Sequence, residues 1–178
     1  YDGMYSGVML VPEEKLGIVV LTNSMTGISH ALILRILDAY LGGRGNDWAA
    51  ELLPREKWNQ RRKVQVQENL GSSRVEGAEP SLKLTAYAGT YGGQLYGDAA
   101  VELEKGRLVV RFKPAEDFVA DLKHLRDDTF LLTWRKNFPW FGKGTCRFLV
   151  GKSGKVEEMK IDVPNEDFWF TELEFKRR

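Results

Sequence analysis

Residues 4–22 constrain the fold most strongly, because they contain two apolar runs joined by a short polar turn. Met4–Val11 leads through Pro12–Gly17 into Ile18–Thr22. Aliphatic and β-branched runs of this length, bounded by proline and glycine, predict the strands of an antiparallel hairpin. Neither run alternates cleanly between apolar and polar residues, so we expect both faces to be covered, as in the middle of a large sheet. The hairpin therefore predicts the tail of a bigger fold.

A predicted helix follows the hairpin between Ile28 and Leu41, where only four of the residues are polar. This apolar surface is wider than a single exposed helix needs, so we expect the helix to lie on a sheet. Thr26 can cap its start, and Gly42 can end it in the left-handed conformation. The helix is too short and too charged to span a bilayer.

The hairpin also carries a resemblance to a known family. Residues 1–12 and 17–24 follow the pattern Gly…Ser…Pro…Gly…Val-x-Leu-x-Asn, which includes Pro12, Gly17 and Asn23. This pattern resembles the end of the serine β-lactamase/penicillin-binding-protein-like hydrolases. In that family the segment follows a His-x-Gly or Lys-Thr-Gly motif and precedes a C-terminal helix. The resemblance implies that Tyr1 and Asp2 flank the substrate cleft of a parent enzyme.

A second resemblance covers the chain from about Leu84 onward. Tyr87–Tyr91, Tyr96–Gly97 and Leu122–Trp134 resemble the lipocalin-like domain of unknown function that is appended to some of these hydrolases. Along the chain, the two resemblances follow the order in which the hydrolase domain and the appended domain occur in that family. They imply a periplasmic or otherwise extracytoplasmic location. They also imply that the chain's partner is the missing hydrolase domain or another copy of the chain.

The motifs that such hydrolases need for catalysis are absent, so we expect no catalytic residue in this chain. No serine has a lysine three residues later, and no Tyr-x-Asn, Ser-x-Asn or His-x-Gly occurs. The serine nucleophile needs that lysine nearby to accept its proton. Lys143–Thr145 contains the letters of the third motif in the wrong order. The resemblance implies that the parent hydrolyses an amide or ester bond without a cofactor.

Composition gives little reason to expect other partners. The net charge is +1, and glutamates interleave with the basic residues of 55–69, which predicts a solvated helix rather than a nucleic-acid surface. The chain has one cysteine and two histidines, so neither an internal disulfide nor a multi-histidine metal site is expected. We expect His124 to fasten a strand turn through a structural hydrogen bond. No apolar run is long enough to span a membrane.

The chain divides into three predicted parts. Residues 1–43 form the terminal hairpin and helix of a β-lactamase-like domain, residues 44–83 a helical connector and linker, and residues 84–178 a barrel. In the connector, Asn46 or Asp47 can cap a short helix. Pro54 either ends that helix or begins the next one.

Short predicted strands with turns between them follow Leu84. The turns lie at Lys105–Gly106, Asp127–Asp128 and Ser153–Gly154, and apolar and charged residues alternate in the strands. This spacing predicts an antiparallel meander that closes into an eight-stranded, lipocalin-like barrel. The fold class is thus an α+β N-terminal remnant, a β-hairpin plus helices, followed by an all-β barrel. The predicted strands are 89–96, 99–105, 107–113, 117–125, 129–135, 145–151, 155–162 and 168–176.

Most aromatic residues of the chain lie in the predicted barrel. They suggest a cavity for a small apolar ligand, with Tyr91, Tyr96 and Trp134 as contacts. The alternative, which we favour, is that a barrel of this size fills itself with bulky side chains.

The segment Asn137–Gly142 is a proline-containing aromatic cluster at a predicted turn. Phe138, Trp140 and Phe141 there predict an exposed patch that docks on another surface. The alternatives are that these side chains plug the barrel, or that they contact a membrane or a ligand. For the whole chain, the hypothesis is an accessory, non-catalytic fragment of a hydrolase for docking, oligomerisation or substrate gating. The competing hypothesis is a stand-alone module that binds a small apolar ligand.

Overall fold

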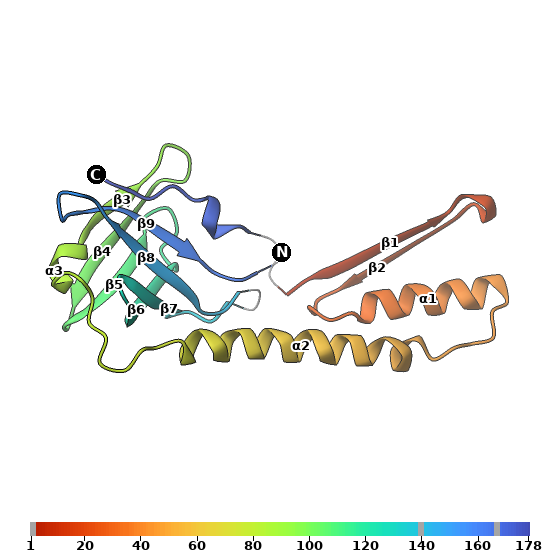
Figure 1. Ribbon diagram of the computed structural model, residues 1–178. Coiled ribbons are helices and arrows are strands. Elements are labelled where there is room, and N and C mark those ends of the chain that lie inside the picture. Colours follow the sequence, from red (N-terminus) through yellow and green to blue (C-terminus); the bar gives the residue numbers. More distant parts are fainter. Residues whose placement is uncertain (1–2, 139–140, 166–167) are drawn as a thin grey trace. The chain divides into compact units, whose positions relative to one another are not determined.

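The structure, a computed structural model, describes residues 3–138, 141–165 and 168–178. The chain divides into two compact units, residues 1–65 and 66–178 (Figure 1). The three predicted domain ranges stay predictions. In the described parts of the chain, no helix has both the length and the apolar character needed to cross a membrane.

The first unit begins with the predicted hairpin. Strands β1 (Tyr5–Val11) and β2 (Leu16–Thr22) pair antiparallel, with Val8 opposite Val19. A 3-10 turn, η1 (Pro12–Glu14), joins the two strands. These strands form a sheet of their own, separate from the barrel sheet.

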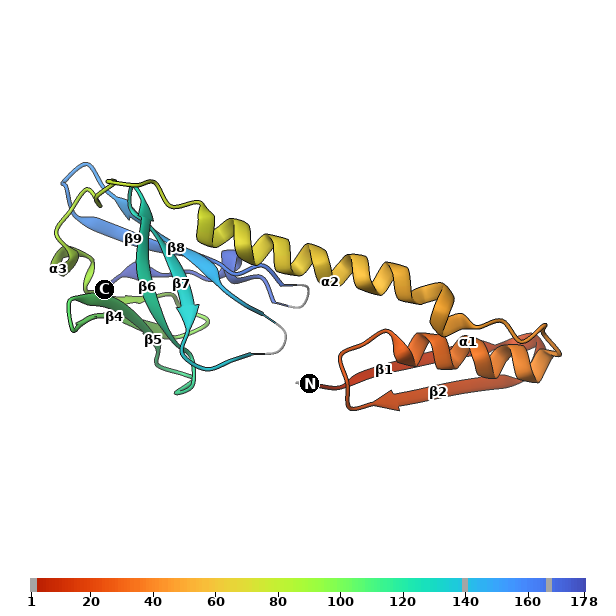
Figure 2. The same ribbon diagram turned by 90° about the horizontal axis from the view of Figure 1, so that it is seen from below.

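Helix α1 (Ile28–Leu41) lies along one face of the hairpin, as Figure 2 shows. Gly7 allows the close approach, because a Cβ atom at this position would lie 2.6 Å from Cδ1 of Ile33. Gly42 ends the helix with a φ of 71°, as predicted. The predicted cap at Thr26 is wrong: Gly27 occupies the N-cap position and no side chain bonds to the helix start.

The other face of the hairpin is exposed in this chain, although the sequence predicts coverage on both faces. Val8, Leu10, Val19 and Leu21 point to this side and are 66%, 71%, 63% and 77% exposed. The reason is that side chains alternate along a strand, so one helix covers only one face. We call these four residues the outer hairpin face.

Helix α2 (Trp48–Ser72) is one continuous helix of 25 residues. Asp47 caps it, since its Oδ1 accepts a hydrogen bond of 3.0 Å from the backbone N–H of Ala50. The prediction that Pro54 ends one helix or begins another is wrong, because Pro54 lies inside α2. A proline there removes one backbone hydrogen bond, and the remaining bonds of this long helix persist on both sides of it.

The second unit contains a closed antiparallel barrel of eight strands, which confirms the predicted fold class (Figure 1). Each strand pairs with its neighbours in sequence, and β10 closes the barrel by pairing with both β3 and β9. A short helix, α3 (Leu84–Tyr87), precedes the first strand. The strands are β3 (Gly89–Gly92), β4 (Asp98–Glu104), β5 (Arg107–Phe112), β6 (Val119–Arg126), β7 (Thr129–Trp134), β8 (Gly144–Val150), β9 (Val156–Asp162) and β10 (Lys176–Arg177).

The connections give the barrel two different ends. At one end lie the tight turns predicted from sequence, such as Lys105–Gly106, where both residues have positive φ and fit a two-residue hairpin loop. At the other end lie the four longer connections, which we call the loop end. The predicted strand 168–176 is wrong in extent: Phe170–Glu172 form a 3-10 turn, η2, and only Lys176–Arg177 pair in the sheet. Phe170 and Phe175 instead turn into the core.

Candidate functional site

Two of the aromatic residues predicted to dock on another surface, Phe138 and Phe141, lie at the loop end, between β7 and β8. Phe141 is only 5% exposed, and its ring lies 5.3 Å from that of Trp134 and 5.4 Å from that of Phe170. Phe138 is half-buried and stacks on Phe141 at 4.8 Å. Phe141 therefore belongs to the core and does not form part of an exposed patch. This arrangement is the plugging alternative, in which aromatic loop residues close the barrel.

Three other predicted residues lie outside what the structure describes: Tyr1, Asp2 and Trp140. The assignment of Tyr1 and Asp2 to the rim of a substrate cleft, and of Trp140 to a docking patch, stays a prediction.

The three predicted ligand contacts do not converge on one site. Tyr91 is fully buried, and its hydroxyl donates a hydrogen bond of 2.6 Å to the backbone carbonyl of Tyr87. Trp134 packs among the aromatic rings of the loop end, including Phe112 and Phe118. Tyr96 lies in the loop between β3 and β4 and is 49% exposed.

The barrel interior is filled by its own side chains. Within the described parts of the barrel unit, twenty buried residues form one cluster, with Tyr91, Phe130 and Phe148 among the largest. Burial raises the pKa of Tyr91 to about 12 and raises that of the Cys146 thiol as well. Both groups are therefore neutral at physiological pH, and neither is activated as a nucleophile.

One polar atom in this aromatic region lacks a partner. The indole Nε1 of Trp134 is buried and makes no hydrogen bond to any residue that the structure describes. Its neighbours are aromatic rings, with Phe138 edge-to-face at 5.7 Å. A buried N–H without an acceptor is uncommon in folded proteins.

The turn end of the barrel has a compact polar cluster around Asp128. Its carboxylate accepts hydrogen bonds from the Tyr87 hydroxyl at 2.5 Å, from the Ser81 hydroxyl at 2.8 Å and from the Ser81 backbone N–H at 3.1 Å. Nearby, His124 Nε2 lies 2.7 Å from the Asp127 carbonyl, which confirms that His124 fastens the strand turn. The cluster ties the segment before the first strand to the β6–β7 turn.

The charge state of this cluster follows from its contacts. Burial raises the pKa of Asp128, but the hydrogen bonds from Tyr87 and Ser81 lower it by more, so the net pKa lies below its usual value. Burial, followed by the contact with Asp128, raises the pKa of Tyr87. Asp128 is thus an ionised acceptor and Tyr87 a neutral donor at neutral pH, which suits a structural anchor rather than proton transfer.

Besides Tyr96, the exposed aromatic residues in the described part of the loop end are Phe168 and Trp169, which sequence reasoning did not select as site residues. They are 39% and 66% exposed. The side chain of Asn165 holds this loop: Oδ1 accepts from the Phe168 N–H, and Nδ2 donates to the Phe168 carbonyl, both at 2.6 Å. An asparagine three residues before an aromatic pair was the available signal for such a turn.

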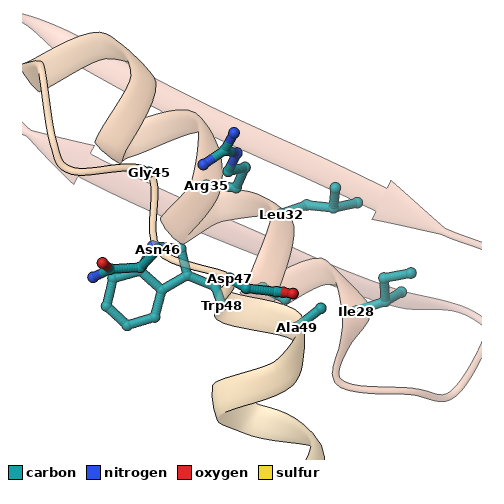
Figure 3. Close-up of a pocket in the computed structure, with 9 residues that line it drawn as sticks. Ile28, Leu32, Arg35, Gly45, Asn46, Asp47, Trp48 and Ala49 are labelled. Carbon is teal, nitrogen blue, oxygen red and sulfur yellow. The ribbon is translucent and has the colours of Figure 1, made fainter.

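The first unit has a surface pocket between α1 and the start of α2, shown in Figure 3. Its volume is about 450 Å³, and Ile28, Leu32, Arg35 and Trp48 contribute side chains to it. The indole Nε1 of Trp48 donates a hydrogen bond of 2.8 Å to Oδ2 of Asp38, which fixes one wall. Among the residues that the structure describes, no group of His, Cys, Asp and Glu is arranged to hold a metal ion.

Comparison with known families matches residues 73–177 to a family described as a domain of unknown function, DUF3471. The match covers more than half of the chain. The chain belongs to the DUF3471 family. No match is found among curated proteins or among solved structures.

The DUF3471 region contains all eight strands of the barrel and begins well before the first of them. The additional segment, residues 73–88, includes Ser81 and Tyr87, which bond to Asp128. Val75 is also tied to the barrel, because its N–H donates a hydrogen bond of 3.0 Å to the carbonyl of Leu125. The family match and the hydrogen bonds therefore include this segment in the same structural unit.

Proposed function

We propose that this chain is a non-catalytic C-terminal part of a β-lactamase-like serine hydrolase. In this proposal residues 1–43 complete the hydrolase domain, and the DUF3471 barrel is an accessory domain for docking, oligomerisation or substrate gating. Two sequence resemblances in the family's order support it, and the family match supports the assignment of the second region.

The observation that carries the proposal is that both edges of the hairpin are open and unprotected. In the described chain β1 and β2 pair only with each other, so each strand has an open outer edge. Neither strand contains a charged residue or a proline. Natural edge strands are usually protected by such residues, and a lone two-stranded hairpin is marginally stable. The strands therefore have the character of central strands in a larger sheet.

The outer hairpin face supports the same conclusion. Its four aliphatic side chains are each more than 60% exposed and form one contiguous apolar surface across the two strands. Covering an exposed aliphatic side chain contributes about 1.5–3 kcal/mol. In our proposal the remaining elements of the hydrolase domain cover this face and extend both edges.

The proposed chemistry belongs to the hydrolase domain, and this chain supplies none of its reacting groups. A serine hydroxyl would attack the amide or ester carbonyl while a lysine amine takes its proton. The leaving amine or alcohol then departs, and water hydrolyses the acyl-serine. Peptides are the substrates that we favour, and an extracytoplasmic location is part of the proposal.

The proposal is tested by reading the coding region upstream of Tyr1 and expressing the whole polypeptide. We expect Ser-x-x-Lys and Tyr-x-Asn motifs upstream. A fluorescent penicillin or fluorophosphonate probe should label the whole polypeptide, and the 178-residue chain should remain unlabelled. A reading frame without these motifs would contradict the proposal.

A second candidate, a module that binds a small apolar ligand, is favoured by the unpartnered Nε1 of Trp134. A ligand with a carbonyl or ether oxygen could accept its hydrogen bond. Native mass spectrometry of the purified chain would then show a bound small molecule, and Trp134→Phe would weaken its retention. An unliganded chain that also fails to bind added fatty-acid esters would rule this candidate out.

A further inference from the structure

Helix α2 has two different sides within the first unit. The indole N–H of Trp48 donates a hydrogen bond of 2.8 Å to Asp38, and a Cβ atom at Gly27 would lie 3.5 Å from Oε2 of Glu56. The residues of this side recur at helical spacing and are half-buried: Trp48, Leu52, Glu56 and Asn59. The other side of α2 is exposed in this chain.

The exposed side is rich in positive charge and contains an exposed indole. Residues 55–63 include five basic residues and one glutamate. Trp58 is 59% exposed, and three arginines lie three or four positions away from it, which places them beside it on the helix surface. We call the five exposed residues of this side the α2 cationic face: Arg55, Lys57, Trp58, Arg61 and Arg62.

The charges of the α2 cationic face are not compensated by carboxylates. Within the described chain, the side chains of Arg55, Lys57 and Arg61 make no ion pair or hydrogen bond. Arg62 lies over the Trp58 ring, with Cζ 5.6 Å from the ring centroid. The glutamate of this stretch lies on the half-buried side and accepts a hydrogen bond of 3.2 Å from the Gln60 side chain. The donors of three cationic groups are therefore available for an anionic partner.

The shape and the indole indicate which kind of anionic partner fits. The side of a helix is convex, so this face can lie flat on a surface. Helices that combine Arg and Lys with Trp lie in the interface of anionic membranes. Indole rings are enriched at the level of the lipid headgroups, because the ring is apolar and its N–H is polar. Each Lys or Arg near an anionic lipid surface raises the binding constant by about fivefold.

We propose that the α2 cationic face binds the surface of an anionic phospholipid membrane, with the helix axis in the plane of the membrane. The guanidinium groups bind lipid phosphates, and the Trp58 indole enters the headgroup region. The helix lies on the membrane and does not cross it. This inference goes beyond the proposed function and does not depend on it, since all the residues that carry it lie in α2.

Sedimentation with phospholipid vesicles tests the proposal on the 178-residue chain. One vesicle preparation contains phosphatidylglycerol and phosphatidylcholine, and the other contains phosphatidylcholine alone. We expect binding to the first preparation and its loss in about 0.5 M NaCl, because salt screens exposed charges. No binding would overturn the proposal. Equal binding to both preparations would also overturn it, because the exposed apolar face of the hairpin would then explain the binding.

Charge reversal locates the binding surface. The double variant Arg55→Glu, Arg61→Glu should weaken binding to phosphatidylglycerol vesicles by about tenfold or more. The matched control, Lys152→Glu with Lys155→Glu, makes the same change of net charge at an exposed turn between β8 and β9 and should bind like the wild type. Circular dichroism checks that both variants keep their helix content. Equal losses in the two variants would contradict the proposal, because net charge alone would then account for them.

Fluorescence quenching tests the contact of the indole with lipid. Bromine atoms on the acyl chains quench an indole that enters the bilayer. We expect quenching in the wild type and in Trp169→Phe, and a clear loss of quenching in Trp58→Phe. Unchanged quenching in Trp58→Phe would refute the placement of α2. A chain that binds polyglutamate but no vesicles would also refute it and would indicate an acidic protein as the partner.

Discussion

The two units of this chain use their apolar residues in opposite ways. Among the described residues, the first unit buries only three hydrophobic side chains, Ile18, Ala31 and Ile33, whereas the barrel unit buries more than twenty. Conversely, most of the large exposed hydrophobic side chains of the described chain lie in the first unit. Burial of apolar surface is the dominant favourable term in folding. The barrel therefore has its own core, while the first unit contains many apolar residues that remain exposed in this chain.

This difference indicates which part of the molecule is self-sufficient. The barrel closes its sheet, so no strand edge is left open, and its loop-end aromatics complete the interior. The hairpin and α1 leave two apolar surfaces exposed. One is the outer hairpin face, and the other is formed on α1 by Ile28, Leu32, Ile36 and Tyr40. A sequence can be apolar on every side of an element only if other elements cover those sides.

The largest expected effect is on the barrel core. Phe148 is 2% exposed, and its ring lies 5.0 Å from Tyr87 and 5.6 Å from Phe130. Phe148→Ala should lower the free energy of unfolding of the barrel by about 4 kcal/mol, through lost burial and a cavity. Urea unfolding followed by circular dichroism measures this. Leu21→Ala on the outer hairpin face is the matched control and should leave the free energy of unfolding of the barrel unchanged. An equal loss of stability in that variant would contradict the contrast between a buried barrel core and an exposed hairpin face.

The second-largest effect on stability is expected at Asp128, in the polar cluster at the turn end of the barrel. Asp128→Asn should destabilise the barrel by about 2 kcal/mol at pH 7, because the charged acceptor of the Tyr87 and Ser81 hydrogen bonds is lost.

The pH dependence of stability in this variant tests whether the negative charge of Asp128 contributes to folding. Since the folded pKa of Asp128 is depressed, its contribution is present above the ordinary carboxyl pKa of about 4 and is lost as pH falls through the folded value. The difference in the free energy of unfolding between the wild type and Asp128→Asn, measured by urea unfolding, should therefore become smaller below about pH 4. A gap that stays constant from pH 7 to pH 3 would show that the carboxylate charge plays no part.

A smaller effect is expected where α2 meets the loop end within the second unit. The Gln67 side chain accepts a hydrogen bond of 2.6 Å from the Lys143 N–H and donates one of 3.3 Å to the Lys143 carbonyl. Gln67→Ala should cost about 1 kcal/mol of barrel stability. Gln60→Ala, in the first unit, should leave barrel unfolding unchanged. Equal losses in the two variants would argue against this contact.

The smallest effect on stability should accompany a large effect on association. Val19→Ser on the outer hairpin face should change the free energy of unfolding by less than about 0.5 kcal/mol, since the side chain is already exposed. It should, however, reduce self-association of the isolated chain, measured by analytical ultracentrifugation, because exposed apolar strands associate. A wild-type chain that stays monomeric at high concentration would remove the basis for this prediction.

Sequence reasoning predicted the regular parts of the fold well, for identifiable reasons. Leu108 and Val110 lie on one face of β5 and Arg107 and Arg111 on the other, and Lys105–Gly106 fits a two-residue turn, so strands and turns can be predicted from local sequence. It failed at residues 168–176, where an aromatic run reads as a strand but turns inward through η2.

The candidate sites were less predictable, because they depend on contacts between distant residues. Phe141 looks like an exposed loop aromatic in sequence, and only the closed barrel places it against Trp134 and Phe170. Asp128 binds Tyr87 and Ser81, which are 41 and 47 residues away in sequence, so no local pattern could reveal the anchor. Phe168 and Trp169 were recognised as aromatic residues, but their exposure depends on the turn held by Asn165.

Hydrogen–deuterium exchange on the 178-residue chain, compared with the polypeptide that also carries the proposed hydrolase domain, tests the central claim most directly. We predict that the amides of β4–β9 exchange slowly in both proteins. Those of β1, β2 and α1 should exchange quickly in the short chain and become protected only in the long one. Hairpin amides as protected as those of the barrel in the short chain would contradict the account, because the first unit would then need no covering domain.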